Sequence, residues 1–163
     1  KRDDPVVVVN SLSKSWSMTG WRLGWIVAPP ALISAIEKMT EFNVSHPTSF
    51  AQWGGVAALD QGDAYIAGLV RRYAAAGAQV YARLAALPRV RLAPPRASFY
   101  AFFAVDGMTD SLGFAKALIA RARVGLAPGV AFGAAGEGRL RLCFASSTAR
   151  LDAALDRLEP HLR

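Results

Sequence analysis

The sequence predicts an α/β fold in which strands and helices alternate, with a smaller α+β module in the second half. Two observations predict it: strand-length β-branched runs alternate with amphipathic helical segments, and 53% of the 163 residues are apolar while 19% are charged. Such a composition supplies a sizeable core and excludes a wholly disordered chain. Because the longest apolar runs fall far short of the roughly 20 residues that cross a bilayer, no membrane partner is expected.

Two strands joined by a polar loop are predicted in the first part of the chain. The run Val6–Val9 is of the kind that is buried on both faces of a parallel sheet, and Leu23–Ala28 has the same character. The loop at residues 10–14 is rich in hydroxyl groups. Apolar residues at helical spacing predict a helix over residues 31–42, and a second helix is expected over 48–60. This part therefore has parallel-type strands accompanied by helices.

The strongest helix of the sequence begins at Asp63, a good N-cap residue, and ends before Pro88. Further along the chain, the pattern predicts strands near residues 90–92, 99–103, 124–127 and 140–145, and helices over 112–122 and 148–158. This alternation indicates helices packed against a sheet. The expected domains are residues 1–61 and residues 62–163.

Charge and cysteine content limit the classes of function. The net charge is +7, from 19 basic and 12 acidic side chains, but the basic residues are scattered, so no nucleic-acid partner is expected. The single cysteine, Cys143, excludes an internal disulfide framework and a cysteine-based zinc site. It favours a reducing, cytoplasmic setting, and Cys143 itself is expected to be buried on its strand.

One group of residues between the first two strands points to chemistry. Lys14 lies in the loop with Ser11 and Ser13 nearby, and Arg22 follows across a turn at Gly20. Loops that leave the ends of parallel strands are where α/β folds bind ligands. A lysine can form a Schiff base with an aldehyde, while an arginine fork and serine hydroxyls can hold a phosphate. A lysine beside a phosphate anchor is what pyridoxal phosphate requires, although ordinary loop cations would also fit this spacing.

The motifs resemble those of a known family along nearly the whole chain. Residues 11–24 satisfy every restricted position of the cofactor-lysine signature of class I/II aminotransferases, which are fold-type-I pyridoxal-phosphate enzymes. Residues 95–100 resemble the family's segment that enters a small-domain strand, although Ala97 and Ser98 depart from the usual residues. Residues 128–133 and 138–145 resemble two further family segments, and all four segments occur in family order.

The resemblance implies a role for each of these residues. Lys14 would bind pyridoxal phosphate as a Schiff base and then move the proton between the substrate Cα and the cofactor. Arg22 and Ser11 would bind the cofactor phosphate, with Ser13 as a further candidate. Arg141 would bind the substrate α-carboxylate.

Several neighbouring groups receive a plainer interpretation. Arg139 lies on the same strand face as Arg141, so the motif, and not the spacing, selects Arg141. The glycines at residues 133–138 occur in the wrong order for a dinucleotide-binding loop, which predicts a flexible loop. Asp152 and Glu159 are expected to be solvated.

The resemblance also implies how the chain is organised. The family's other cofactor-binding groups lie upstream of the cofactor lysine, and few residues precede Lys14 here. We therefore expect a C-terminal fragment: residues 1–61 from the end of the large domain, and residues 62–163 as the small domain. The full-length enzyme would be a homodimer that acts on an amino acid and a 2-oxo acid, while the fragment alone would be inactive.

Two alternative functions remain open. A pyridoxal-phosphate lyase of the same fold, such as a carbon–sulfur lyase, would use the same residues. A transcription regulator with an aminotransferase-like ligand-sensing domain would also resemble this sequence. The identity of the amino donor does not follow from these residues.

Overall fold

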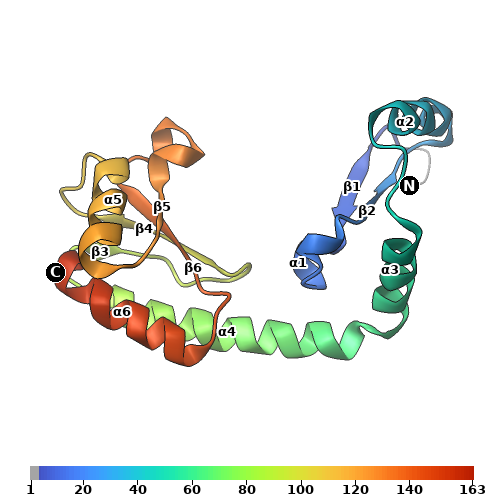
Figure 1. Cartoon of the computed structure of the whole chain (residues 1–163). Coiled ribbons are helices and arrows are strands. Elements are labelled where there is room, and N and C mark those ends of the chain that lie inside the picture. The colour runs from blue at the N-terminus through green and yellow to red at the C-terminus, as the bar shows by residue number, and fades with distance from the viewer. Residues whose placement is uncertain (1–3) are drawn as a thin grey trace. The chain divides into compact units, whose positions relative to one another are not determined.

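The computed structural model describes residues 4–163 and has a mixed α/β fold. The chain divides into two compact units, Lys1–Leu69 and Val70–Arg163, and the division falls inside helix α4 (Asp63–Ala85). Both units are drawn in Figure 1. The first unit contains, in chain order, β1 (Val8–Ser11), α1 (Leu12–Ser15), the 3-10 turn η1 (Thr19–Trp21), β2 (Gly24–Val27), α2 (Pro30–Asn43), α3 (Ser49–Gln61) and the start of α4.

Strands β1 and β2 pair in the antiparallel direction, with Val8 opposite Val27 and Ser11 opposite Gly24. The expectation of parallel-type strands is therefore wrong for this pair. The antiparallel direction follows from the short connection between the strands, which α1 and η1 turn back on itself. A parallel pair would need a longer crossover that returns the chain to the starting end of the first strand. Glycine is needed at position 24 because a Cβ there would overlap the carbonyl oxygen of Asn10.

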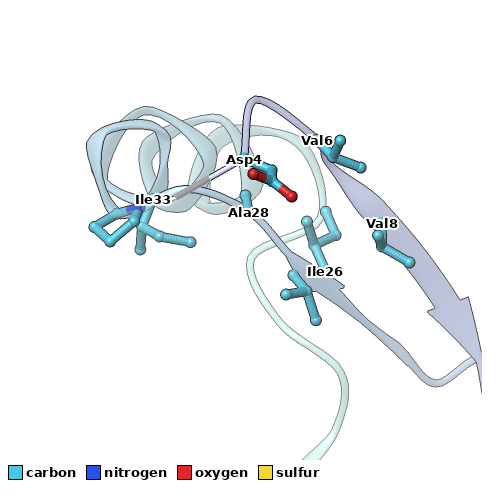
Figure 2. A pocket seen from close by; sticks show the side chains of 8 residues that line it. Asp4, Val6, Val8, Ile26, Ala28 and Ile33 are labelled. Carbon is cyan, nitrogen blue, oxygen red and sulfur yellow. The ribbon is translucent and has the colours of Figure 1, made fainter. Parts of the chain in front are cut away.

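The two strands are exposed and not buried on both faces as the β-branched runs predicted. Val9 is 74% exposed and Val27 is 55% exposed, because β1 and β2 form a two-stranded ribbon that the other described elements leave largely uncovered. A hollow of about 760 Å³ lies beside this ribbon. Figure 2 shows four of the side chains that line it, Val6, Val8 and Ile26 together with Ile33 of α2. Its lining is mostly aliphatic.

The helices of the first unit form where the periodicity predicted them. Helix α2 extends the expected range by one residue at each end, with Pro30 at its first turn, where the missing N–H costs no hydrogen bond. Helix α3 matches the second expected helix within one residue. No helix within residues 4–163 combines the length and the apolar character that crossing a membrane requires.

The second unit is built on a four-stranded antiparallel sheet in the order β3-β4-β6-β5. Its elements are the remainder of α4, β3 (Val90–Arg91), β4 (Tyr100–Val105), α5 (Ser111–Ala122), β5 (Ala127–Pro128), the 3-10 turns η2 (Gly129–Phe132) and η3 (Ala134–Gly136), β6 (Arg139–Cys143) and α6 (Thr148–Leu162). All four predicted strands exist. The strand expected over residues 124–127 is reduced to two residues, and the expected loop at 133–138 contains the ordered turn η3.

The two faces of this sheet differ in character. On the inner face, Phe103 and Leu140 are fully buried in a core shared with helices α4, α5 and α6. On the outer face, Arg139 and Arg141 alternate with those buried residues and are only half-buried. Cys143 follows the same alternation onto the outer face and is exposed, so the expectation of a buried cysteine is wrong.

Helices α4 and α6 are joined by a core and by an ion-pair network. Arg83 of α4 pairs with three acidic residues of α6. Hydrogen bonds from Arg83 to Glu159 and then to Asp156 are the main causes that raise the pKa of its guanidinium. Asp152 also accepts a hydrogen bond from Gln79. Asp152 and Glu159 are therefore ion-pair partners, and not simply solvated acids as expected.

Candidate functional site

Lys14 lies on the single helical turn α1, directly after strand β1, and not in an irregular loop as predicted. Ser11 caps this turn: its backbone is extended, and its Oγ accepts a hydrogen bond from the Ser13 N–H at 3.1 Å. This is the usual action of a serine at a helix N-terminus. The structure thus brings Ser11, Ser13 and Lys14 together on one turn, where the Lys14 side chain is exposed.

A buried leucine fixes the turn to the strand pair. Leu12 is 1% exposed, and its N–H donates to the carbonyl oxygen of Leu23 at 3.1 Å, one residue before β2 begins. Its own carbonyl oxygen accepts from the N–H groups of Trp16 and Met18, each at 3.3 Å. The backbone around Lys14 is therefore held from both sides.

Helix α3 supports the segment through glycines that admit bulky side chains. A Cβ at Gly54 would overlap the indole of Trp21, and a Cβ at Gly55 would overlap the side chain of Leu23. The glycine pair weakens the helical signal of the sequence. The two glycines are needed because any side chain at either position would keep α3 from packing against Trp21 and Leu23.

Trp16 packs inside the first unit. Its indole N–H donates to the carbonyl oxygen of Ala58 at 2.8 Å, and its ring leaves no room for a Cβ at Gly62. The ring also meets Trp25 edge to face, with the centroids 6.5 Å apart. Trp16 is therefore a packing residue that ties the Lys14 segment to the end of α3.

Arg22 lies in the left-handed region with φ 53°, which is unfavourable for a residue with a side chain. Its Nη1 donates to the Thr19 carbonyl oxygen at 2.9 Å, and the side chain is exposed. Arg22 lines a hollow of about 900 Å³ with residues of η1, the α2–α3 connection and α3. Lys14 and Ser11 do not line this hollow.

The candidate cations have no acidic partner within the described residues. No carboxylate among residues 4–163 lies within ion-pair distance of Lys14, Arg22 or Arg141. By contrast, Arg83 and Arg91 are both neutralised by acids of their own unit.

Arg141 lies in the second unit, on the central strand β6. Its guanidinium carbon is 4.2 Å from the ring centroid of Tyr100 and 4.3 Å from that of Phe132. Each such cation–π contact contributes about 0.5–1 kcal/mol at an exposed site, and together they fix the plane of the fork. Sequence reasoning missed this role of the two aromatic residues. The signals were available, because Tyr100 shares the strand alternation and Phe132 belongs to a family segment.

Arg139 has a looser environment on the same face. Its guanidinium carbon lies 5.7 Å from the ring centroid of Phe102, which stands directly opposite Arg141 in the strand register. The structure thus distinguishes the two arginines that spacing alone left equivalent: one lies against two aromatic rings, the other beside one ring.

Comparison with known proteins bears directly on this arrangement. A model of the family described as Aminotransferase class I and II matches residues 1–158. The chain belongs to this family. A probable N-acetyl-LL-diaminopimelate aminotransferase from Bacillus subtilis is 40% identical over 160 residues, covering 96% of this chain and 40% of the relative. An aspartate aminotransferase from Pyrococcus horikoshii is 34% identical over 159 residues, covering 96% of this chain and 41% of the relative.

Solved aminotransferase structures share the fold. An aminotransferase from Mycobacterium tuberculosis superposes with a TM-score of 0.88 at 35% identity, covering 96% of this chain and 41% of that chain. An aspartate aminotransferase from Thermotoga maritima has a TM-score of 0.86 at 35% identity, covering 96% and 40% of the two chains. The sequence therefore spans about 40% of the length of the aminotransferases that it matches.

Proposed function

We propose that this chain is part of a longer aminotransferase that depends on pyridoxal phosphate, and that it carries the cofactor lysine and the substrate-carboxylate arginine. The observation that carries the proposal is the presentation of Lys14. A capped helical turn, held by Leu12, places this lysine at the signature position of an aminotransferase-family sequence, and no carboxylate within residues 4–163 pairs with it.

The proposed layout divides the chain between two domains of the longer enzyme. Residues 1–61 belong to the end of the large domain, and residues 62–163 form the small C-terminal domain. The exposed apolar ribbon of β1 and β2 supports the first assignment, because a strand pair of this composition is stable when further strands and helices cover it. The self-contained core of the second unit supports the other assignment.

The side chains present in the first unit suit pyridoxal phosphate. Lys14 would hold the cofactor aldehyde through its amine, and Arg22 would offer guanidinium donors to the phosphate. Ser11 accepts the Ser13 N–H through its Oγ, which leaves its hydroxyl proton free to donate to a phosphate oxygen. Ser13 adds a second hydroxyl to the same turn.

When bound, pyridoxal phosphate supplies an electron-withdrawing ring that makes the Cα–H of an amino acid acidic. Lys14 would serve as the base that removes the Cα proton of the amino acid and as the acid that delivers it again. Arg141 holds the substrate carboxylate through a fork whose plane is set by Tyr100 and Phe132. The net reaction would exchange the amino group of an amino acid for the oxo group of a 2-oxo acid.

Transamination is favoured over a lyase reaction because the relatives described above are named aminotransferases. We further propose that the longer enzyme is a cytoplasmic homodimer. Trp21, which is 47% exposed beside the Arg22 hollow, supplies apolar surface for such a contact. Residues 1–163 alone should bind pyridoxal phosphate poorly and should not transaminate.

A set of three arginine substitutions in the longer enzyme tests the roles. Loss of one charge-assisted contact costs about 1.5–3 kcal/mol, or roughly 10- to 100-fold in affinity. Arg22→Ala should weaken cofactor retention by that factor, as measured by dialysis and absorbance. Arg141→Ala should leave the cofactor bound and raise the KM for the amino and 2-oxo acids.

Arg139→Ala provides the matched control, because it removes an arginine from the same strand face two residues away. It should change the KM far less than Arg141→Ala does. Equal effects of the two substitutions would show that the motif does not single out Arg141. An Arg22 variant that holds its cofactor normally but has a raised KM would show that the two roles are exchanged.

A further inference from the structure

In the segment that carries Phe132 toward Arg141, two backbone turns lie in direct contact. It contains the turns η2 and η3, which lie between strands β5 and β6. Gly129 and Gly136 are both buried, and a Cβ on either one would overlap the carbonyl oxygen of the other. The two turns therefore meet backbone to backbone, and Phe132 lies on the loop that these contacts close.

A carboxylate ties this segment to helix α5. Glu137 Oε1 accepts the N–H of Ser111 at 2.7 Å and the N–H of Gly138 at 2.8 Å. These two backbone donors, with the Gly138 N–H contributing most, lower the pKa of Glu137 from its ordinary value of 4.5, and the Ser111 hydroxyl acts in the same direction. Because Ser111 begins a helix of 12 residues, the negative charge also meets the positive end of its dipole.

The hydroxyl of Ser111 ties the same helix to turn η2. Ser111 is fully buried at 0% exposure, and its Oγ accepts the N–H of Val130 at 3.1 Å. Val130 lies two residues before Phe132 in the same turn. Buried hydroxyls are kept in folded proteins when their hydrogen bonds are made, and this one connects the start of α5 to the turn that carries Phe132.

Together these contacts link Glu137, through Ser111 and Phe132, to the guanidinium of Arg141. Glu137 holds the start of α5 and the start of β6, Ser111 holds η2, and Phe132 of η2 lies against the Arg141 guanidinium. Arg141 has no acidic neighbour within residues 4–163 to orient it. Its orientation therefore depends on the aromatic rings and on whatever fixes those rings.

We propose that Glu137 and Ser111 are positioning residues for substrate recognition: they fix Phe132 against Arg141 so that the guanidinium fork is preset for a carboxylate. This inference rests on the proposed function, in which Arg141 binds the substrate carboxylate. Neither residue touches the substrate. Preset geometry lowers the entropy lost on binding, so its loss weakens binding even when every contact can still form.

The first test is made on the 163-residue chain and needs neither cofactor nor activity. Ring currents from Tyr100 and Phe132 should move the Arg141 side-chain protons upfield in NMR spectra. In Glu137→Gln and in Ser111→Ala, those protons should shift back toward the position of an unstacked arginine. Glu37→Gln is the matched control, because Glu37 is exposed on α2 and makes no side-chain hydrogen bond or ion pair that the structure shows within residues 4–163.

Core resonances separate positioning from unfolding. The methyl groups of Leu140 and Leu142, on the inner face of the same strand, should stay in place in both variants. Unchanged Arg141 proton shifts in both folded variants would overturn the proposal. If Glu137→Gln fails to fold, Ser111→Ala decides the outcome, because it removes only the hydroxyl that holds Val130.

The second test uses the longer enzyme loaded with its cofactor. Glu137→Gln and Ser111→Ala should raise the KM for the amino and 2-oxo acids about threefold to tenfold, with kcat at saturation and cofactor retention unchanged. A fall in kcat at constant KM would overturn the positioning role. If the wild-type enzyme does not transaminate, the proposed function fails, while the NMR result still shows whether Glu137 and Ser111 position Arg141.

Discussion

The two units of this chain differ in how far they bury the apolar side chains of their helices. In the second unit, α6 buries Leu155 and Leu158 completely beneath a four-stranded sheet. In the first unit, α3 leaves Phe50 72% exposed and Trp53 74% exposed, beside a ribbon of only two strands. Apolar residues in a helical segment therefore predict a helix, but not whether the same chain covers those residues.

The number of strands explains the contrast. A two-stranded ribbon has two unpaired edges and cannot bury both faces, while three or more strands under helices can support an independent core. The second unit meets this condition with β3, β4, β5 and β6. The first unit supplies the proposed cofactor residues, so the proposal places the cofactor in the unit whose apolar side chains are less fully buried.

Hydrogen exchange should show the largest difference between the units. Amides of β4 and β6 in the 163-residue chain should open only with the second unit, giving protection at least about a thousandfold greater than that of β1 and β2. The reason is the core beneath the second sheet. Exchange followed by mass spectrometry measures both regions in one sample, and equal protection would remove the contrast.

A pair of leucine substitutions sharpens the comparison. Leu155→Ala removes a side chain that is 0% exposed in the second unit and should cost about 2–5 kcal/mol of unfolding free energy. Leu59→Ala removes a side chain of α3 that is 51% exposed, and should cost less than about 1 kcal/mol. Denaturant titration of the 163-residue chain measures both. A large loss from Leu59→Ala would mean that α3 packs in solution against a surface that the structure leaves open.

The smallest effect concerns pH and the second unit alone. The native-state pKa of Glu137 lies below its ordinary value of 4.5, because backbone N–H groups stabilise its charge. Its contribution to stability is therefore complete above about pH 4.5 and is lost as the pH falls through the lower native-state pKa. Unfolding curves between pH 6 and 3 should be less steeply pH-dependent for Glu137→Gln than for wild type, while Glu37→Gln should follow wild type.

The sequence predicted the order and type of the main elements because hydrophobic periodicity records which face is buried. It failed where pairing depends on the connection. The β-branched run at Val6–Val9 indicated a parallel-type strand, but the direction of β1 and β2 is set by the tight reversal through α1 and η1. Cys143 is exposed because strand alternation places it on the outer face with Arg139 and Arg141, whereas an apolar segment suggests burial for every residue in it.

The candidate site was predictable where a motif names a residue. Lys14, Arg22 and Arg141 came from family segments, and their roles remain proposals. The support around them was not predictable, because it depends on tertiary contacts between distant residues. Nothing in the local sequence connects Glu137 with Ser111, which lies 26 residues earlier. Likewise, the need for glycine at position 54 depends on its contact with Trp21, which is distant in the sequence.

Mapping the site of cofactor attachment tests most directly whether Lys14 is the cofactor lysine. The longer enzyme that contains this sequence is loaded with pyridoxal phosphate, reduced with borohydride and digested, and the pyridoxyl peptide is identified by mass spectrometry. We expect one adduct, on Lys14, and none in Lys14→Arg. An adduct on Lys38 or Lys116, or retention of the label in Lys14→Arg, would contradict this expectation.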